Sequence, residues 1–246
     1  MKKLNSICPE KKLGQMTDDN CILGVSNNAL FTMDGRLNDK NKIVDIKSYK
    51  TNPKMDTIAT SNFGGIAVGS ANGEIRLYKQ VGQNAKTLLP GFGGNFILIL
   101  DPILSIDVTS DGKWILATCP TYLLLIPTTC KGNQSGFNVS MGKEKPKPKA
   151  LKLKPIDIAK YKIKSVNFTP AKFNVNHLEG ETNIITSTGD FIINWNFSKV
   201  IKGITDDYKI KRANQNILDS QFKYNKGQIV VTMDNKLRIQ NQKYFI

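Results

Sequence analysis

A run of lysines near the middle of the chain is the part of the sequence best suited to bind a charged partner. Residues 143–154 hold six lysines against one glutamate, and residues 143–172 hold ten lysines against two acids. Ammonium groups attract phosphates, carboxylates and anionic lipid headgroups as point charges. The candidate anion-binding or partner-binding residues are therefore Lys143, Lys145, Lys147, Lys149, Lys152 and Lys154.

Two prolines, Pro146 and Pro148, alternate with lysines in this run. Proline cannot donate a ladder hydrogen bond and favours an extended, solvated chain. We therefore predict a lysine-rich loop at about 131–154 that connects two blades and leads into an edge strand near 150–154. Two roles are open: an anion-binding arm for acidic protein, phospholipid or RNA, or a solvated loop whose charge protects a sheet edge, which is the commoner case.

Residue types that carry out catalysis or hold metals are sparse. The adjacent carboxylates Asp18-Asp19 and Asp206-Asp207 lie in turn-like sequences, where aspartate is favoured for backbone hydrogen bonding. The single histidine, His177, has no ligand-like neighbour, and residues 91–94 lack the Gly-Lys-Ser/Thr of a phosphate-binding loop. We expect no enzyme activity, no catalytic, cofactor-binding or metal-binding residue, and no small-molecule substrate.

The overall charge favours an anionic partner but not sequence-specific reading of a nucleic acid. The 246 residues carry a formal net charge of +15, which attracts nucleic acids and anionic membranes. Only four of the 35 basic residues are arginines, whereas proteins that read bases usually rely on the arginine fork. Any contact with nucleic acid or an anionic membrane is therefore expected to be weak.

The start of the chain and its cysteines indicate the cellular compartment. The basic start of the chain runs into the charged segment 10–12 before an apolar core of a signal peptide can form. The four cysteines form no Cys-x-x-Cys pair, and Cys21 and Cys119 lie in apolar strands, where we expect small core residues. These features predict a reducing, cytoplasmic location, with the nucleus as a second compartment.

A repeated hairpin signal defines the elements that must position the lysines. A short apolar strand, a turn and a second apolar strand recur at intervals of 45, 47, 69 and 46 residues. Periods in the forties are typical of propeller blades, which are four-stranded sheets that cannot bury their faces alone. The turns are Asn27-Asn28, Asn72-Gly73, Cys119-Pro120, Thr188-Gly189 and Asp234-Asn235.

The sequence thus predicts an all-β fold, a β-propeller of about five four-stranded blades in a single domain, 1–246. It is either a closed small ring or part of a larger ring lacking its N-terminal blades. Tyr78 and Trp195 fall at similar offsets after their turns, where WD-type repeats place a large aromatic residue, and we expect both, with Trp114, in the core. Only residues 156–161 could form one or two helical turns.

Several longer segments resemble one known family. They are 73–78 (GEIRLY), 107–119 (DVTSDGKWILATC), 121–126 (TYLLLI) and 168–174 (FTPAKFN). In order and spacing they resemble the C-terminal WD-repeat-like propeller of the vacuolar import and degradation protein twenty-seven family. The resemblance covers roughly residues 13–212. Family proteins are longer, and residues 94–100 look like an insertion relative to them.

The resemblance implies a process rather than a reaction. It implies a role in delivering cytosolic proteins to the vacuole for degradation, and no enzymatic activity. Together with the residues, it predicts a non-catalytic protein-interaction scaffold with protein partners. The alternative is an electrostatic binder of RNA or anionic membrane that acts through residues 143–172.

Overall fold

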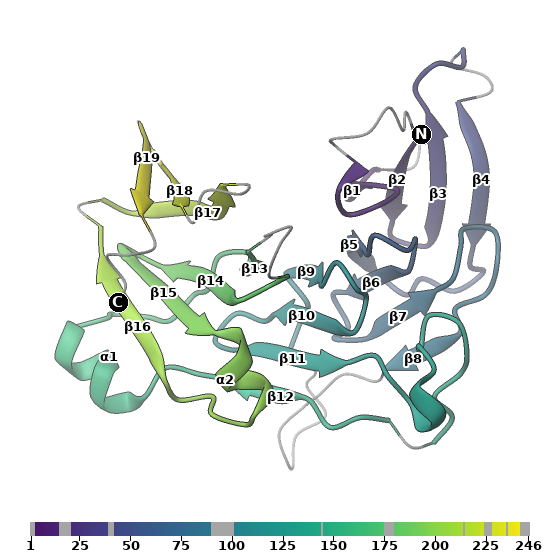
Figure 1. Ribbon diagram of the computed structural model, residues 1–246. Coiled ribbons are helices and arrows are strands. Elements are labelled where there is room, and N and C mark those ends of the chain that lie inside the picture. Colours follow the sequence, from purple (N-terminus) through teal and green to yellow (C-terminus); the bar gives the residue numbers. More distant parts are fainter. Residues whose placement is uncertain are drawn as a thin grey trace. The chain divides into compact units, whose positions relative to one another are not determined.

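The computed structural model describes residues 3–14, 21–38, 42–89, 101–143, 145–174, 180–213, 215–223, 228–234 and 236–241. Over these residues the chain forms four four-stranded sheets and one three-stranded sheet, all antiparallel (Figure 1). The chain divides into two compact units. Unit 1 comprises Met1–Ile115 and Ile126–Lys147, and unit 2 comprises Leu116–Leu125 and Pro148–Ile246.

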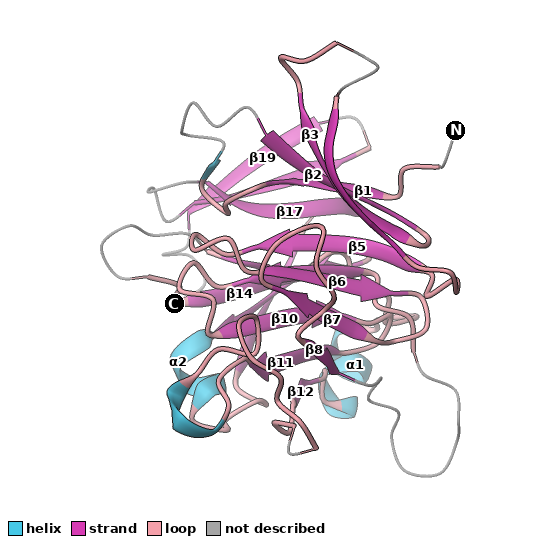
Figure 2. Cartoon of the chain, turned by 90° about the vertical axis from the view of Figure 1, so that its right-hand side faces the viewer, coloured by secondary structure: helices cyan, strands magenta, loops and turns pink. Residues whose placement is uncertain are grey.

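Unit 1 begins with two sheets in which consecutive strands are neighbours. The first contains β1 (Ser6–Pro9), β2 (Cys21–Ser26), β3 (Ala29–Asp34) and β4 (Ile43–Ser48). The second contains β5 (Met55–Thr60), β6 (Ile66–Ser70), β7 (Ile75–Tyr78) and β8 (Thr87–Leu89). Figure 2, which colours strands magenta and helices cyan, shows how little helix accompanies them.

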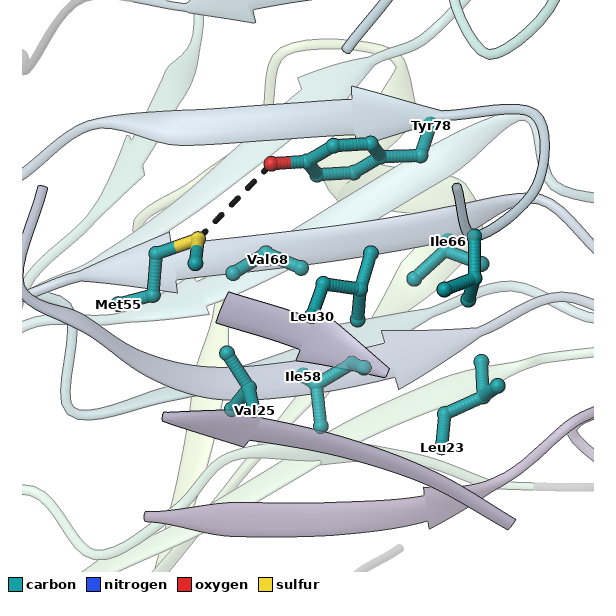
Figure 3. Packing of buried hydrophobic residues seen from close by; sticks show 9 residues of the cluster. Leu23, Val25, Leu30, Met55, Ile58, Ile66, Val68 and Tyr78 are labelled. Atoms are coloured by element: carbon teal, nitrogen blue, oxygen red, sulfur yellow. Dashed lines mark hydrogen bonds between the residues drawn. The ribbon is translucent and has the colours of Figure 1, made fainter. Parts of the chain in front are cut away.

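Alternating side chains of these two sheets form one core (Figure 3). Successive residues of a strand point to opposite faces, and the buried members of this core are Leu23, Val25, Leu30, Met55, Ile58, Ile66, Val68, Tyr78 and Val81. The hydroxyl of Tyr78 lies 3.8 Å from the Met55 sulfur and 2.9 Å from the Tyr49 hydroxyl. Burial and the hydrogen bond with Tyr49 raise the pKa of Tyr78. The predicted core position of Tyr78 is confirmed.

The next sheet contains β9 (Ser105–Val108), β10 (Trp114–Thr118), β11 (Leu123–Pro127) and β12 (Lys149–Leu151), in the order β12-β11-β10-β9. The boundary between the units passes through β10 and β11. Residues 128–148, with a short 3-10 helix at Lys131–Asn133, connect β11 to β12. The lysine run therefore begins in a connection between two strands of the same sheet, because β12 pairs with β11. The predicted connection between two blades is wrong for this part of the run. The predicted edge strand is β12, at one end of the sheet.

Unit 2 contains two further sheets. One has β13 (Lys172–Phe173), β14 (Asn183–Thr188), β15 (Phe191–Asn196) and β16 (Tyr208–Arg212); the other has β17 (Ile217–Lys223), β18 (Gln228–Met233) and β19 (Lys236–Asn241). Trp195 is fully buried on β15. Its Nε1 donates a 3.1 Å hydrogen bond to the Thr205 carbonyl, and its ring packs against Phe168 and Tyr208. The predicted core position of Trp195 is confirmed.

Four of the predicted turn pairs occupy the same place in their sheets, between the second and third strands. They join β2 to β3, β6 to β7, β10 to β11 and β14 to β15. The fifth pair includes Asn235, which lies outside the described residues. Gly73 takes a φ of 78°, which only glycine adopts without strain. The 69-residue interval is longer because it contains both the 128–148 connection and a helix. The predicted repeat and the all-β propeller fold are thus reflected in the sheets.

The two α-helices of the described residues lie in unit 2. Helix α1 (Pro155–Tyr161) covers the predicted helical turns, whereas α2 (Phe197–Ile201) was not predicted. The Asn196 carboxamide accepts a 3.0 Å hydrogen bond from the Lys199 amide and caps α2, which buries Phe197 and Val200. Among the described residues, no helix is long and apolar enough to cross a membrane.

Two core assignments differ from the sequence prediction. Trp114 is only partly buried, because it is the first residue of β10 and follows the turn in which the Gly112 amide donates to the Thr109 carbonyl. Cys119 is buried with 1% of its surface exposed, as predicted, but Cys21 at the start of β2 is partly exposed. The proposed insertion at 94–100 lies outside the described residues.

Candidate interaction surfaces

The division between the units separates the six predicted lysines into two groups of three. In unit 1, Lys143 and Lys147 are exposed and Lys145 is half-buried. Lys143 lines a hollow of about 400 Å³ together with Cys130 and Gln134. Lys143 and Cys130 are titratable, and none of the described residues that line the hollow is a histidine or an acid.

In unit 2, the other three lysines lie on β12 and the segment that leads into α1. Lys149 stands opposite Leu125 in the β11–β12 pair. The Lys152 ammonium is 5.2 Å from the centre of the Tyr122 ring, within the range of a cation–π contact. The Lys154 ammonium lies 3.2 Å from an oxygen of Asp206. These lysines are therefore held at the outer edge of a sheet.

Tyr208 fixes the start of α1 onto β16. Its hydroxyl accepts a 2.6 Å hydrogen bond from the Lys154 amide and donates a 2.7 Å hydrogen bond to Asp157 Oδ2. Lys154 is the N-cap residue of α1, and its side chain makes no capping hydrogen bond. The tyrosine hydroxyl thus satisfies one of the unpaired amides at this helix end. Burial is the main cause that raises the pKa of Tyr208, to about 12.

Replacing Tyr208 with phenylalanine should reduce the stability of the protein at neutral pH by about 1–2 kcal/mol, because two partly buried hydrogen bonds lose their hydroxyl. The folded-state pKa of about 12 exceeds the ordinary value of 10.0. The native tyrosine therefore contributes fully below about pH 10, and its contribution disappears as the pH rises through about 12. Urea unfolding of both proteins at about pH 8 and about pH 11 should show the difference narrowing; a constant difference would contradict this assignment.

Further basic residues surround α1. Lys160, Lys162 and Lys164 are all exposed, and the Lys160 ammonium lies 5.4 Å from the centre of the Tyr161 ring. Tyr161 packs edge-on against Phe191 at 5.9 Å, and the guanidinium of Arg212 lies 5.5 Å from the Phe191 ring. A basic surface thus extends from α1 to β16. We call its exposed lysines, Lys152, Lys160, Lys162 and Lys164, the α1 lysines.

The residues considered for catalysis do not assemble into a site in the described parts of the chain. Asp206 pairs with Lys154, and Asp207 pairs with Lys199, whose hydrogen bond lowers the pKa of the Asp207 carboxyl. Asp18, Asp19, His177 and residues 91–94 lie outside the described residues. Within the described residues, no group of three or more histidine, cysteine or acidic side chains could hold a metal ion.

An exposed phenylalanine in unit 1 escaped the sequence analysis. Phe63 is 84% exposed, and it lies in the loop between β5 and β6. The loop is closed on itself, since the Ser61 amide donates to the Gly65 carbonyl at 2.9 Å and the Gly65 amide donates to Ser61 Oγ at 3.0 Å. The available signal was the sequence Asn-Phe-Gly-Gly, in which a large aromatic residue occupies a turn.

Neighbouring segments brace the Phe63 loop from two sides. The Asn62 amide donates to the Ser110 carbonyl at 3.0 Å, and Asn62 Oδ1 accepts from the Leu13 amide at 3.1 Å. The Lys12 amide donates to the Ser61 carbonyl at 3.3 Å. The backbone of the loop is therefore fixed while the phenyl ring stands in solvent.

The fold is shared with solved propeller structures at low sequence identity. A chain of a crystal structure of the mitotic checkpoint complex superposes with a TM-score of 0.65 at 12% identity, covering 98% of this chain and 61% of that one. The β-propeller domain of Cps50 (Swd1) from Myceliophteria thermophila superposes with a TM-score of 0.64 at 9% identity, covering 97% of this chain and 65% of that one. These similarities support a WD40-type β-propeller fold.

Two curated proteins are similar to this chain in sequence. Vacuolar import and degradation protein 27 of Schizosaccharomyces pombe is 40% identical over 231 residues, which is 90% of this chain and 28% of that protein. The protein of the same name in Saccharomyces cerevisiae is 33% identical, over 96% of this chain and 31% of that protein. The chain therefore spans less than a third of the length of these relatives.

The family match also extends beyond the segments that first indicated it. The family model described as "VID27 C-terminal WD40-like domain" matches residues 1–246, including 213–246, which lie beyond the segments that showed the resemblance. The chain therefore belongs to the family of the VID27 C-terminal WD40-like domain.

Proposed function

We propose that this chain is a non-catalytic interaction platform that docks a protein partner on the Phe63 loop. The observation that carries the proposal is an aromatic side chain, 84% exposed, on a backbone braced by the hydrogen bonds of Ser61 and Asn62. Exposed aromatic residues are frequent anchors of protein interfaces. A fixed loop loses little conformational entropy when it binds, which favours affinity.

Family membership and fold support the non-catalytic part of this proposal. Binding residues are disproportionately carried by loops that a rigid scaffold positions. The two curated relatives carry the name vacuolar import and degradation protein 27. In this proposal residues 1–246 act as one cytoplasmic domain, with the nucleus as a second compartment, that takes part in the same process. The lysine pairing of Asp206 and Asp207 also favours a structural role over acid–base chemistry.

A photo-crosslinking phenylalanine analogue at position 63 tests the docking site directly. In cells, this variant should trap one or a few proteins after irradiation. The matched control carries the same analogue at position 88, since Leu88 is a 41% exposed residue on β8 of the same unit. Equal products from positions 63 and 88 would mean that Phe63 is an ordinary surface residue.

Replacing Phe63 with alanine should weaken binding of the trapped partner by about 30-fold, the loss typical of an aromatic hot spot. Thermal melting should stay unchanged, because the ring packs against little of the protein. Calorimetric titration of the purified pair measures the affinity, with Leu88→Ala as the control that should bind like the native chain. Unchanged affinity of Phe63→Ala would refute the assignment.

The electrostatic alternative has independent support in unit 2. The α1 lysines form no ion pair with any acid among the described residues. Surface lysines are usually solvated, but four close to a single short helix make a site at which anionic groups accumulate. Replacing them with glutamine should abolish any salt-sensitive binding to RNA or anionic vesicles.

A further inference from the structure

We propose that α1 is a contact site for an anionic phospholipid membrane, with Ile156 entering the headgroup region and the α1 lysines lying against lipid phosphates. This inference rests on the electrostatic alternative above and names its partner. It goes beyond charge, because it assigns a role to an apolar side chain. The two parts make different predictions, so they can fail separately.

Ile156 is exposed to an unusual degree for a large aliphatic residue. It is the second residue of α1, and 73% of its surface is accessible. No residue of the helix is buried, so α1 lies on the surface and does not form part of the core. Ile156 and Lys160 are four residues apart and therefore lie on the same side of the helix. One side of α1 thus presents an aliphatic group next to a cation.

Acids do not neutralise this surface in the described structure. Asp157, the acid of α1, accepts a hydrogen bond from Tyr208, and Asp206 pairs with Lys154. Asp190 lies 2.6 Å from the Arg212 guanidinium. The α1 lysines therefore keep their charge available for an external anion. Lysines that flank an exposed apolar residue are typical of segments that bind the interface of an anionic membrane.

The helix is held in place, so the isoleucine stays presented. Tyr208 fixes its N-terminal end. At its C-terminal end, the Ile163 amide donates a 3.0 Å hydrogen bond to the Ile158 carbonyl, and the Ile163 side chain is 8% exposed. Because both ends are anchored, Ile156 cannot turn into the core without loss of these contacts.

The surface suits a membrane better than RNA. Proteins that bind single-stranded nucleic acid offer aromatic rings or arginine planes on which bases stack. Here the Tyr122 and Tyr161 rings are each approached by a lysine, and the protruding group is aliphatic. Transfer of an isoleucine side chain from water into the acyl boundary of a bilayer is favourable. RNA binding is therefore kept as an outcome of the test.

Sedimentation of the full chain with vesicles of phosphatidylcholine alone, or mixed with phosphatidylserine, tests the proposal. Native protein should bind the mixed vesicles only. Ile156→Ser should lower the partition coefficient about tenfold, since several methylene groups leave the acyl boundary. Lys160→Gln combined with Lys162→Gln and Lys164→Gln should lower it by about 100-fold or more. The control Leu218→Ser, at a 51% exposed residue of β17, should bind like native protein.

A second measurement guards against an indirect effect of the substitutions. Ile156→Trp should show blue-shifted emission, after subtraction of the native spectrum, when phosphatidylserine vesicles are added. Unshifted emission, or equal vesicle binding by Ile156→Ser and native protein, would overturn the membrane assignment. If polyuridylate binding is also lost with the lysines and unaffected by Ile156→Ser, the electrostatic alternative stands with RNA as its partner.

Discussion

Replacing Trp195 with alanine is expected to lower the free energy of unfolding by about 3–5 kcal/mol, the usual cost of removing a fully buried large aromatic residue. The side chain has no exposed surface and contacts Phe168 and Tyr208. Its loss also leaves the Thr205 carbonyl without the indole donor. Urea unfolding followed by circular dichroism measures the change without depending on the missing fluorophore.

Trp114→Ala is the matched control, because it removes the same side chain from a partly exposed position. The area that Trp114 shields from water is smaller, so its loss should cost clearly less. A similar loss of unfolding free energy in both variants would mean that Trp114 contributes as much to stability as a fully buried tryptophan. A near-neutral Trp195→Ala would contradict the core described for unit 2.

Replacing Lys12 with methionine is expected to destabilise unit 1 by about 3 kcal/mol or more, because it removes the ion-pair partner of a largely buried carboxylate. The Lys12 ammonium lies 2.9 Å from Asp107 Oδ1, and the two side chains are 10% and 11% exposed. The ammonium also donates to the Val108 carbonyl. These contacts attach the segment after β1 to β9.

The chain contains a control for this pair in the same unit. Lys113 and Asp111 are 3.2 Å apart, but their side chains are 64% and 45% exposed. Lys113→Met should therefore cost less than about 1 kcal/mol. Adding 1 M salt should change the stability loss of Lys12→Met only slightly, since buried pairs are weakly screened. Similar losses for the two variants would show that burial does not set the strength of these pairs.

The repeat could be predicted from the sequence because its signal is local. Gly73 and Gly189 take positive φ angles of 78° and 56°, which glycine adopts without strain, so these turns are visible without knowledge of distant contacts. Their spacing then indicates the blade period. The core aromatic residues Tyr78 and Trp195 followed from their offsets after these turns.

The candidate interaction surfaces could be predicted only in part. Lysine density is a property of composition, so the basic segment was visible in the sequence. The exposure of Phe63 and Ile156 was not, because burial depends on whether distant segments cover a side chain. The loop of Phe63 is braced by residues at positions 12, 13 and 110, which are distant from it in the sequence. Trp114 was misplaced for the same reason.

The dependence of α1 on Tyr208 has a consequence for synthesis on the ribosome. A helix of seven residues is too short to be stable alone, and its first turn is held by a side chain more than forty residues further along the chain. Residues 155–161 therefore leave the exit tunnel before their partner exists. The nascent helix becomes ordered only after β16 has emerged, so a chain that stalls earlier carries its basic segment unfolded.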